Sequence, residues 1–161
     1  MKRIAIIPAR GGSKRIPRKN IKPFMGKPIM AYPIDAAINS GLFDEVMVST
    51  DDDEIASIAR EYGAAVPFMR NPATSGDDAA LAQVIAEVLA CYENEGSFFD
   101  AFCCILPTAV LISGGRIEEG CVILESKGYD SVFPVARFSY PVQRALKIEK
   151  GTVSMAYPEY M

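Results

Sequence analysis

Apolar residues in this chain gather in short unbroken runs, and longer mixed stretches separate one run from the next. Short apolar runs bounded by turn residues predict buried strands, and the mixed stretches between them have the length of helices. We expect strands over residues 4–8, 45–49, 65–69, 99–106 and 131–135, the fourth of them fully buried. We expect helices over residues 28–40, 50–62, 77–94 and 116–127.

Residues at the helix ends support these bounds. Gly41 and Gly63 each follow a predicted helix, at the position where glycine commonly ends one. Thr50 is the expected N-terminal cap of the second helix, whose first turn carries the four acids of residues 51–54. Pro33 falls in the first turns of the first helix, so this helix starts later or bends there.

The alternation of strands with helices predicts βαβ units and a mostly parallel sheet. The expected fold class is therefore α/β, with a three-layer, Rossmann-like arrangement. A chain of 161 residues, half of them hydrophobic, is long enough for one domain, which we expect to cover residues 1–161. Residues 143–156 alternate around Lys150-Gly151 and predict a hairpin.

Composition excludes several kinds of chemistry. The chain has no histidine, and its four cysteines show no C-x-x-C spacing, which argues against a zinc site and excludes Ser-His-Asp and Cys-His catalysis. The chemistry must therefore use lysine, arginine, carboxylates or a bound metal. No apolar run is long enough to span a bilayer and the start lacks a signal-peptide pattern, so we expect a cytoplasmic protein without a membrane partner.

A basic loop follows the first strand. It contains Gly11, Gly12 and Ser13, together with six cationic side chains between Arg10 and Lys22. Nine of the seventeen Lys and Arg residues lie in the first 34 residues, and all twenty acids come later. Because concentrated like charge repels itself, and because glycines let the backbone approach an anion closely, the loop predicts a phosphate-binding site.

The loop matches neither common glycine motif. The pattern G-x-x-x-x-G-K-[ST] fails because residue 16 or 17 stands where its second glycine is required, and G-x-G-x-x-G fails because Gly11 and Gly12 are adjacent. A solvated basic loop remains open as a simpler interpretation. A nucleic-acid-binding arm is disfavoured because the chain has a net charge of −3.

Ligands of open α/β sheets bind outside the carboxyl ends of the strands. This rule selects the loops over residues 9–19, 50–53, 70–78 and 107–115. The acids of residues 51–54 are compatible with a metal site, but a helix start explains their spacing without a ligand, and we favour that interpretation. Asp77 and Asp78 are likewise explained as helix-capping acids.

The segment A-R-G-G-S-K-R-I-P-R-K-N, followed by G-K-P-I at residues 26–29, resembles the signature of the sugar-acid cytidylyltransferases. The S-T-D-x-x-x-I-A segment at residues 49–56 and the arginine after V-P-F-M also match that family. The resemblance implies a fold of the nucleotide-diphospho-sugar transferase type. It also implies an enzyme that transfers the CMP group of CTP to a nonulosonic acid, with Mg²⁺ as cofactor and with the CMP-sugar and pyrophosphate as products.

The resemblance also implies roles for individual residues. CTP contacts fall on Ala9, Arg10, Gly11, Gly12, Ser13, Asn20 and Arg70, and Arg10 and Lys19 are the expected catalytic residues. Sugar contacts fall on Pro107, Thr108, Arg137, Tyr140 and Gln143, with an adjoining subunit as the alternative partner of the last three. Arg15 and Arg18 are left undecided between a phosphate contact and solvent. The chain departs from the family pattern at Asn71, at residues 77–81 and at Val110.

Residues 130–147 look most like the pseudaminic acid branch, and N-acetylneuraminate, legionaminate and Kdo remain alternative sugars. A non-catalytic nucleotide- or nucleic-acid-binding module is the alternative of another class. The resemblance further implies a homodimer, residues 140–161 as a hairpin or dimerisation extension, and a C-terminal region beyond this chain that supplies the magnesium ligands. We therefore assign no metal ligand here.

Overall fold

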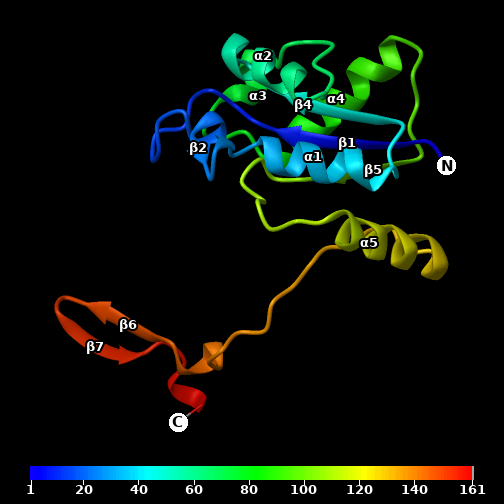
Figure 1. Ribbon diagram of the computed structural model, residues 1–161. Coiled ribbons are helices and arrows are strands. Elements are labelled where there is room, and N and C mark those ends of the chain that lie inside the picture. Colours follow the sequence, from blue (N-terminus) through cyan, green and yellow to red (C-terminus); the bar gives the residue numbers. More distant parts are fainter. Residues whose placement is uncertain (161) are drawn as a thin grey trace.

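The computed structural model describes residues 1–160. At its centre, β1 (Arg3–Pro8) pairs in parallel with β4 (Glu45–Ser49) on one side and with β5 (Ala101–Cys104) on the other (Figure 1). Ile4 pairs with Glu45 in one register and with Phe102 in the other. Residues 4–7 are fully buried, because helices cover both faces of the sheet and leave no polar face for β1.

The helices form the two outer layers. On one face, α1 (Ala31–Ser40), α2 (Asp53–Glu61) and α5 (Gly114–Lys127) share a hydrophobic cluster with Ala5 and Ile7. On the other face, α4 (Leu81–Asn94) packs against Ile4, Ile6 and Met47. This three-layer arrangement confirms the predicted fold class. None of the helices in the described part of the chain is long and apolar enough to cross a membrane.

Short elements lie at the edges of these layers. They are β2 (Pro23–Phe24) and β3 (Lys27–Pro28), which form a small hairpin, α3 (Pro72–Ser75), and 3-10 turns at Lys19–Ile21, Val142–Arg144 and Pro158–Tyr160. The predicted tail hairpin is present as β6 (Leu146–Glu149) and β7 (Thr152–Met155).

Two predicted helix starts are wrong. Asp52, and not Thr50, caps α2: its side chain accepts a hydrogen bond from the Ile55 amide at 3.0 Å, while Thr50 is completely buried. α4 begins at Leu81 and not near residue 77. The acids expected to cap it lie outside the helix, because residues 76–80 turn towards the basic loop instead.

Three predicted strands differ from the structure. Residues 65–69 make only an isolated bridge between Met47 and Ala65, because Pro67 has no N–H for a continuing ladder. β5 is shorter than expected and is not fully buried: Phe102 is 51% exposed on a sheet edge that no further strand covers. Residues 131–135 form no strand, and Pro134 again removes a ladder donor.

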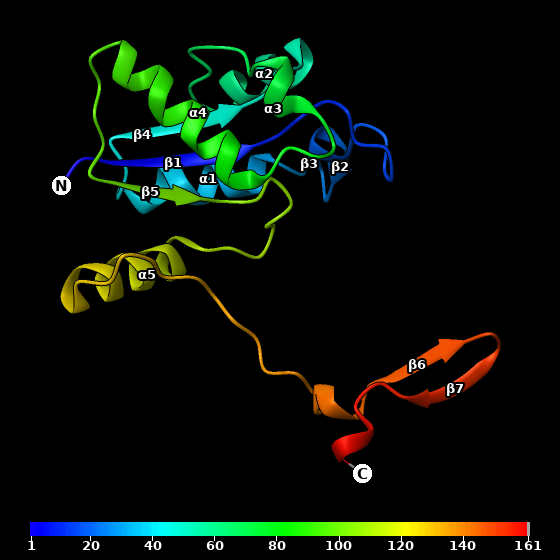
Figure 2. The same ribbon diagram turned by 180° about the vertical axis from the view of Figure 1, so that it is seen from behind.

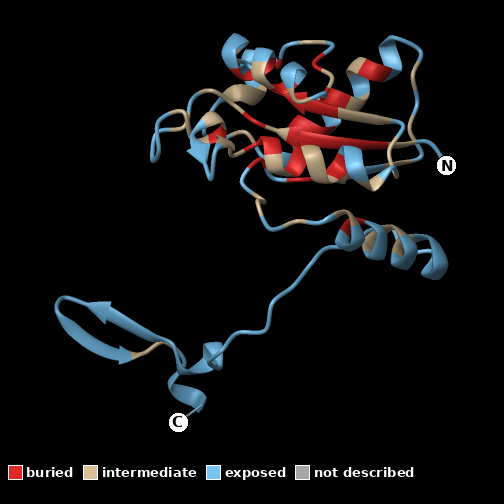
Figure 3. Ribbon diagram, in the orientation of Figure 1, coloured by how far each residue is buried: buried red, intermediate tan, exposed pale blue. Residues whose placement is uncertain are grey.

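Beyond α5 the chain leaves the body of the molecule. Gly128 ends α5 in the left-handed region at φ 62°, and residues 129–160, which we call the arm, run outward to the β6–β7 hairpin (Figure 1). Every residue from 129 to 154 is exposed, and Figure 3 shows the arm in the colour of exposed residues except for a short stretch at the end of β7. The arm therefore contributes nothing to the core formed by residues 1–127.

Candidate functional site

The basic loop begins where β1 ends and is held against the end of β4. The Ala9 amide donates to the Ser49 carbonyl at 2.9 Å, and the Gly11 amide donates to Asp51 Oδ1 at 2.8 Å. A further turn is closed by the Ser13 amide, which donates to the Gly11 carbonyl at 2.9 Å. The loop thus lies at the carboxyl edge of the sheet, as the sequence predicts, and its backbone is fixed by the segment that follows β4.

The two adjacent glycines have different surroundings. A Cβ added to Gly11 would lie 2.7 Å from Asp52 Oδ2 and 2.9 Å from Asp52 Cβ, whereas one added to Gly12 would meet nothing within 4 Å. Neither glycine has its φ in the left-handed region. Gly11 is therefore required for close packing on Asp52, and Gly12 leaves open space over the loop.

Arg10 and Lys14 share one carboxylate. Arg10 donates from Nη2 to Asp77 Oδ1 at 2.6 Å and from Nη1 to the Gly76 carbonyl at 2.7 Å, and Lys14 forms an ion pair with the second oxygen of Asp77. The ammonium of Lys14 and the guanidinium of Arg10 hold the pKa of Asp77 below its usual range. This contact draws residues 76–78 over the basic loop (Figure 2).

Arg18 is tied to the start of α2. Its backbone is left-handed at φ 55°, and its guanidinium pairs with Asp52 and with Glu54. Hydrogen bonds from Arg18 lower the pKa of Asp52, and Asp52 in turn raises the pKa of Arg18. Of the acids at the start of α2, Asp51 accepts a hydrogen bond from the basic loop, Asp52 caps the helix and pairs with Arg18, and Glu54 also pairs with Arg18. Arg15 is exposed.

Asn20 lies at the base of the loop and is 4% exposed. Its Nδ2 donates to the Arg10 carbonyl at 2.9 Å, but its Oδ1 has no hydrogen-bond partner within residues 1–160. A buried acceptor without a donor is uncommon in a native fold, and its partner must come from outside the described residues, as a water molecule or a ligand. Lys19, next to it in the chain, is half-buried.

Arg70 is 7% exposed and is directed towards Ser49. It donates from Nε to Ser49 Oγ at 2.9 Å and from Nη2 to the Ser49 carbonyl at 2.5 Å, the same carbonyl that accepts from Ala9. Burial lowers the pKa of Arg70, with Asp51 and Glu87 acting in the opposite direction. Ser49 therefore joins Arg70 to the first residue of the basic loop, although the two are distant in sequence.

Comparison with known proteins agrees with this geometry. A family model described as Cytidylyltransferase matches residues 4–132. The chain is 39% identical over 159 residues to a pseudaminic acid cytidylyltransferase from Campylobacter jejuni, which covers 99% of this chain and 68% of the relative. The chain belongs to the cytidylyltransferase family. The resemblance carried by the basic loop is thereby confirmed.

Other relatives widen the range of sugars and support the fold. A CMP-N,N'-diacetyllegionaminic acid synthase from Legionella pneumophila is 38% identical over 138 residues, which is 84% of this chain and 60% of the relative. A structure of CMP:2-keto-3-deoxy-manno-octonic acid synthetase complexed with CTP superimposes with a TM-score of 0.66 at 23% identity, covering 80% of this chain and 49% of the other. The chain thus spans about half of that solved structure.

The residues that the cytidylyltransferase resemblance assigns to the sugar fall into two groups. Pro107 is buried and Thr108 is exposed, and both follow β5, whose carboxyl end lies at the same edge of the sheet as the basic loop. Arg137, Tyr140 and Gln143 are exposed on the arm, outside the body of the molecule (Figure 3). The structure brings the first group towards the site and leaves the second group apart from it.

Sequence reasoning missed two residues of the site, Ser49 and Asp77. Ser49 appeared as the last residue of a strand and as the first residue of the family-like segment at residues 49–56, but no sequence signal marks it as a partner of Arg70. Asp77 had a signal: thirty-four residues without an acid need counter-charge from elsewhere in the chain, and carboxylates in loops at the same sheet edge are the nearest source. The helix-capping interpretation hid that role.

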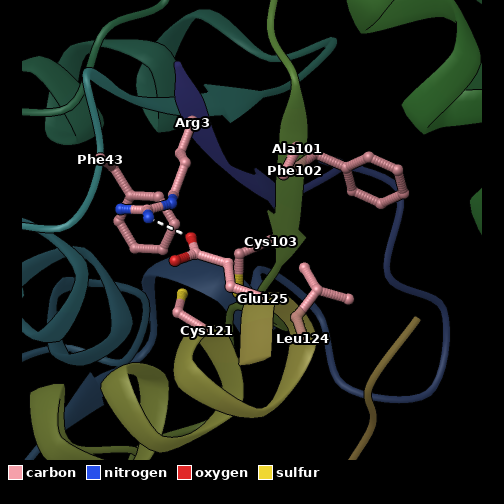
Figure 4. Close-up of a pocket in the computed structure, with 8 residues that line it drawn as sticks. All are labelled: Arg3, Phe43, Ala101, Phe102, Cys103, Cys121, Leu124 and Glu125. Carbon is pink, nitrogen blue, oxygen red and sulfur yellow. Dashed lines mark hydrogen bonds and ion pairs between the residues drawn. The ribbon is translucent and has the colours of Figure 1, made fainter. Parts of the chain in front are cut away.

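A small cavity of about 20 Å³ lies away from this site, between β5 and α5 (Figure 4). Its lining includes Cys103 and Cys121, and the ion pair between Arg3 and Glu125 lies beside it. Burial raises the pKa of Cys103 to about 11. A water-sized, thiol-lined space of this kind belongs to the helix–sheet packing and offers no room for a nucleotide.

Proposed function

We propose that this chain carries the CTP site of a cytidylyltransferase that joins CMP to a nonulosonic acid and releases pyrophosphate. The observation that carries the proposal is the unpartnered Oδ1 of Asn20, buried at the base of a loop with six cationic side chains. In a fold of this family, a base or ribose donor is the natural partner for that acceptor. Pseudaminic acid is the proposed sugar, on the strength of the relatives that span 99% of the chain.

In the proposed reaction, the anomeric hydroxyl of the sugar attacks the α-phosphorus in line and pyrophosphate leaves. Arg10, Lys19 and Ser13 would hold the leaving group, since cations that neutralise the β and γ phosphates stabilise its developing charge. Arg70 would face the base from the side of Ser49. In this proposal, positioning of the reactants and electrostatic stabilisation of the leaving group supply most of the rate enhancement.

Magnesium is the cofactor that the family resemblance implies. Within residues 1–160, no three His, Cys, Asp or Glu side chains are grouped closely enough to hold a metal ion. The carboxylates nearest the loop are engaged, Asp51 by the Gly11 amide, Asp52 by Arg18 and Asp77 by Arg10. The described residues therefore do not form a magnesium site by themselves.

Calorimetric titration tests the nucleotide assignment. We expect the chain to bind CTP more tightly than UTP or ATP, and we expect Arg10→Ala to lose that binding. Arg15→Ala is the matched control, because it removes the same charge from an exposed side chain of the same loop. Equal affinity for the three nucleotides would contradict base recognition by Arg70. Equal loss in both arginine variants would contradict a specific role for Arg10.

We also propose that the chain forms a homodimer through the arm. The arm exposes large apolar side chains that its own body does not cover, among them Phe133, Phe138, Tyr140, Leu146 and Ile148. Apolar side chains in such number are commonly buried against a partner. Sedimentation should show a dimer in the native chain and a monomer after Leu146→Asp with Ile148→Asp. A monomeric native chain would contradict the proposal.

A further inference from the structure

The contact between Asp77 and the basic loop suggests a role that the nucleotide assignment alone does not supply. Asp77 presents one carboxylate oxygen to Arg10 and the other to Lys14, and the preceding Gly76 carbonyl accepts a hydrogen bond from Nη1 of Arg10. The side chain of Asp77 is itself 39% exposed. A single anionic group thus occupies two cations of the loop that is proposed to bind phosphate.

A carboxylate and a phosphate compete for the same donors. Both offer oxygens to the planar fork of a guanidinium, and a triphosphate offers more oxygens and more charge than one aspartate. While Nη1 of Arg10 donates to the Gly76 carbonyl and Nη2 donates to Asp77, the N–H groups on that side of the guanidinium are not available to a phosphate. Asp77 left beside a bound triphosphate would also be repelled by it, because Lys14 and Arg10 keep this carboxyl ionised at neutral pH.

The segment that carries Asp77 is a short turn between two fixed points. Towards α3, the Asn71 amide donates to Glu87 Oε1 at 2.7 Å and the Thr74 hydroxyl also bonds to Glu87. Beyond Gly76, residues 77 and 78 are exposed, and the next fixed point is the Ala80 amide, which donates to Gln83 Oε1 at 2.9 Å. The turn of residues 76–80 can therefore leave the basic loop while its two ends stay in place beside α3 and α4.

We propose that Asp77 is a built-in competitor of the triphosphate, which holds Arg10 and Lys14 until the nucleotide replaces it and residues 76–80 move off the loop. This inference rests on the proposed function, since it requires that the loop receive a triphosphate. It adds that binding proceeds by exchange of one anion for another. Residues 76–80 then act as a flap over the phosphate end of the site.

Affinity measurements with inorganic tripolyphosphate and with CTP test the exchange. We expect Asp77→Asn to bind tripolyphosphate up to about five-fold more tightly than the native chain, the factor typical of one exposed ion pair. Asp78→Asn is the matched control: it removes the same charge one residue away, from a side chain that makes no ion pair within residues 1–160, and should change the affinity much less. Weaker binding by Asp77→Asn would mean that Asp77 positions Arg10, and would overturn the proposal.

Hydrogen–deuterium exchange supplies the second measurement. Tripolyphosphate should speed exchange over residues 76–80 in the native chain, and in Asp77→Asn the same segment should exchange fast without it. Protection of these residues in the native chain on adding tripolyphosphate would overturn the flap. If tripolyphosphate behaves as expected but CTP binds no better than ATP or UTP, the exchange stands and the cytidylyl assignment fails. If tripolyphosphate binds to neither the native chain nor Asp77→Asn nor Asp78→Asn, both the anion exchange and the proposed triphosphate site fail.

Discussion

Gly11→Ala is the substitution whose cost can be worked out most directly from the structure. The added methyl would lie 2.7 Å from Asp52 Oδ2, 2.9 Å from Asp52 Cβ and 3.1 Å from Asp52 Cγ. Rotating the Asp52 side chain relieves the first and third of these contacts but not the second, because Cβ is fixed by the backbone. Rotation also gives up the hydrogen bond from the Ile55 amide that caps α2.

The steric contact and the lost helix cap together set the size of the expected loss of stability. Inserting a methyl group into a packed site costs about 1–3 kcal/mol, and a lost N-terminal cap alone costs about 1 kcal/mol. We therefore expect Gly11→Ala to lower the free energy of unfolding by about 1–3 kcal/mol. Gly12→Ala has open space and an ordinary φ, so it should leave stability unchanged or raise it by less than about 1 kcal/mol, through the unfolded chain.

Urea unfolding of a double-mutant cycle measures the contact itself. Asp52→Gly removes the Cβ and keeps a residue that caps helices almost as well as aspartate. In the Asp52→Gly background, Gly11→Ala should cost close to nothing, so the two substitutions should be strongly non-additive. If Gly11→Ala costs the same in both backgrounds, or if Gly12→Ala is equally harmful, the clash with Asp52 is not the reason for glycine at this position.

Three further predictions follow from pKa shifts and burial. Arg18 lowers the pKa of Asp52 in the folded protein below the usual value near 4, so the native chain should be more stable than Asp52→Asn above that pH. In urea titrations this difference in stability should vanish as the pH falls through the lowered pKa. A difference that grows in acid would contradict the pairing. Arg70→Lys gives up at least one hydrogen bond to Ser49 at a buried site, so it should lower the free energy of unfolding by about 1–3 kcal/mol. It should also weaken the affinity for CTP about ten-fold and leave the affinity for tripolyphosphate unchanged. An equal loss of affinity for both anions would place Arg70 at the phosphate end of the site. Burial raises the pKa of Cys103 to about 11, so alkylation of this thiol should be slow at pH 8 and its rate should rise about ten-fold per pH unit. Peptide mass spectrometry measures the rate. Rapid labelling of Cys103 in the folded chain at pH 8 would contradict the burial.

The elements that sequence predicted best are those whose signal is local. β4 occupies the predicted residues 45–49, and α1 ends before Gly41, which adopts the left-handed conformation expected of a terminal glycine. β1 and the loop after it were found because a fully buried run and a cluster of cations are both visible without knowing their partners. The cytidylyltransferase resemblance was read from that loop for the same reason.

The elements that sequence mispredicted depend on a partner strand. Residues 65–69 and 131–135 are both apolar enough for a strand, but a strand also needs N–H groups facing a neighbour, and Pro67 and Pro134 lack them. Where the apolar run lies against the core, as Val66 does, it stays buried with one bridge; where it does not, it becomes part of the exposed arm. Hydrophobicity predicted burial for both segments, but whether each segment is buried depends on which other elements of the fold lie beside it.

The cations of the loop divide into two classes that sequence could not separate. Arg18 pairs with Asp52, and Asp52 is locked in place by the Ile55 amide and by its packing on Gly11, so this pair belongs to the framework. Arg10 pairs with Asp77, which caps no helix and lies on an exposed turn. Both contacts relieve the same self-repulsion of a basic loop, but only the second can be given up without loss of a helix cap. A cation of the loop can therefore bind a phosphate only if the carboxylate that pairs with it can move away. Asp77 can move away from Arg10, whereas Asp52 cannot leave Arg18, so Arg10 is available to the ligand and Arg18 is not.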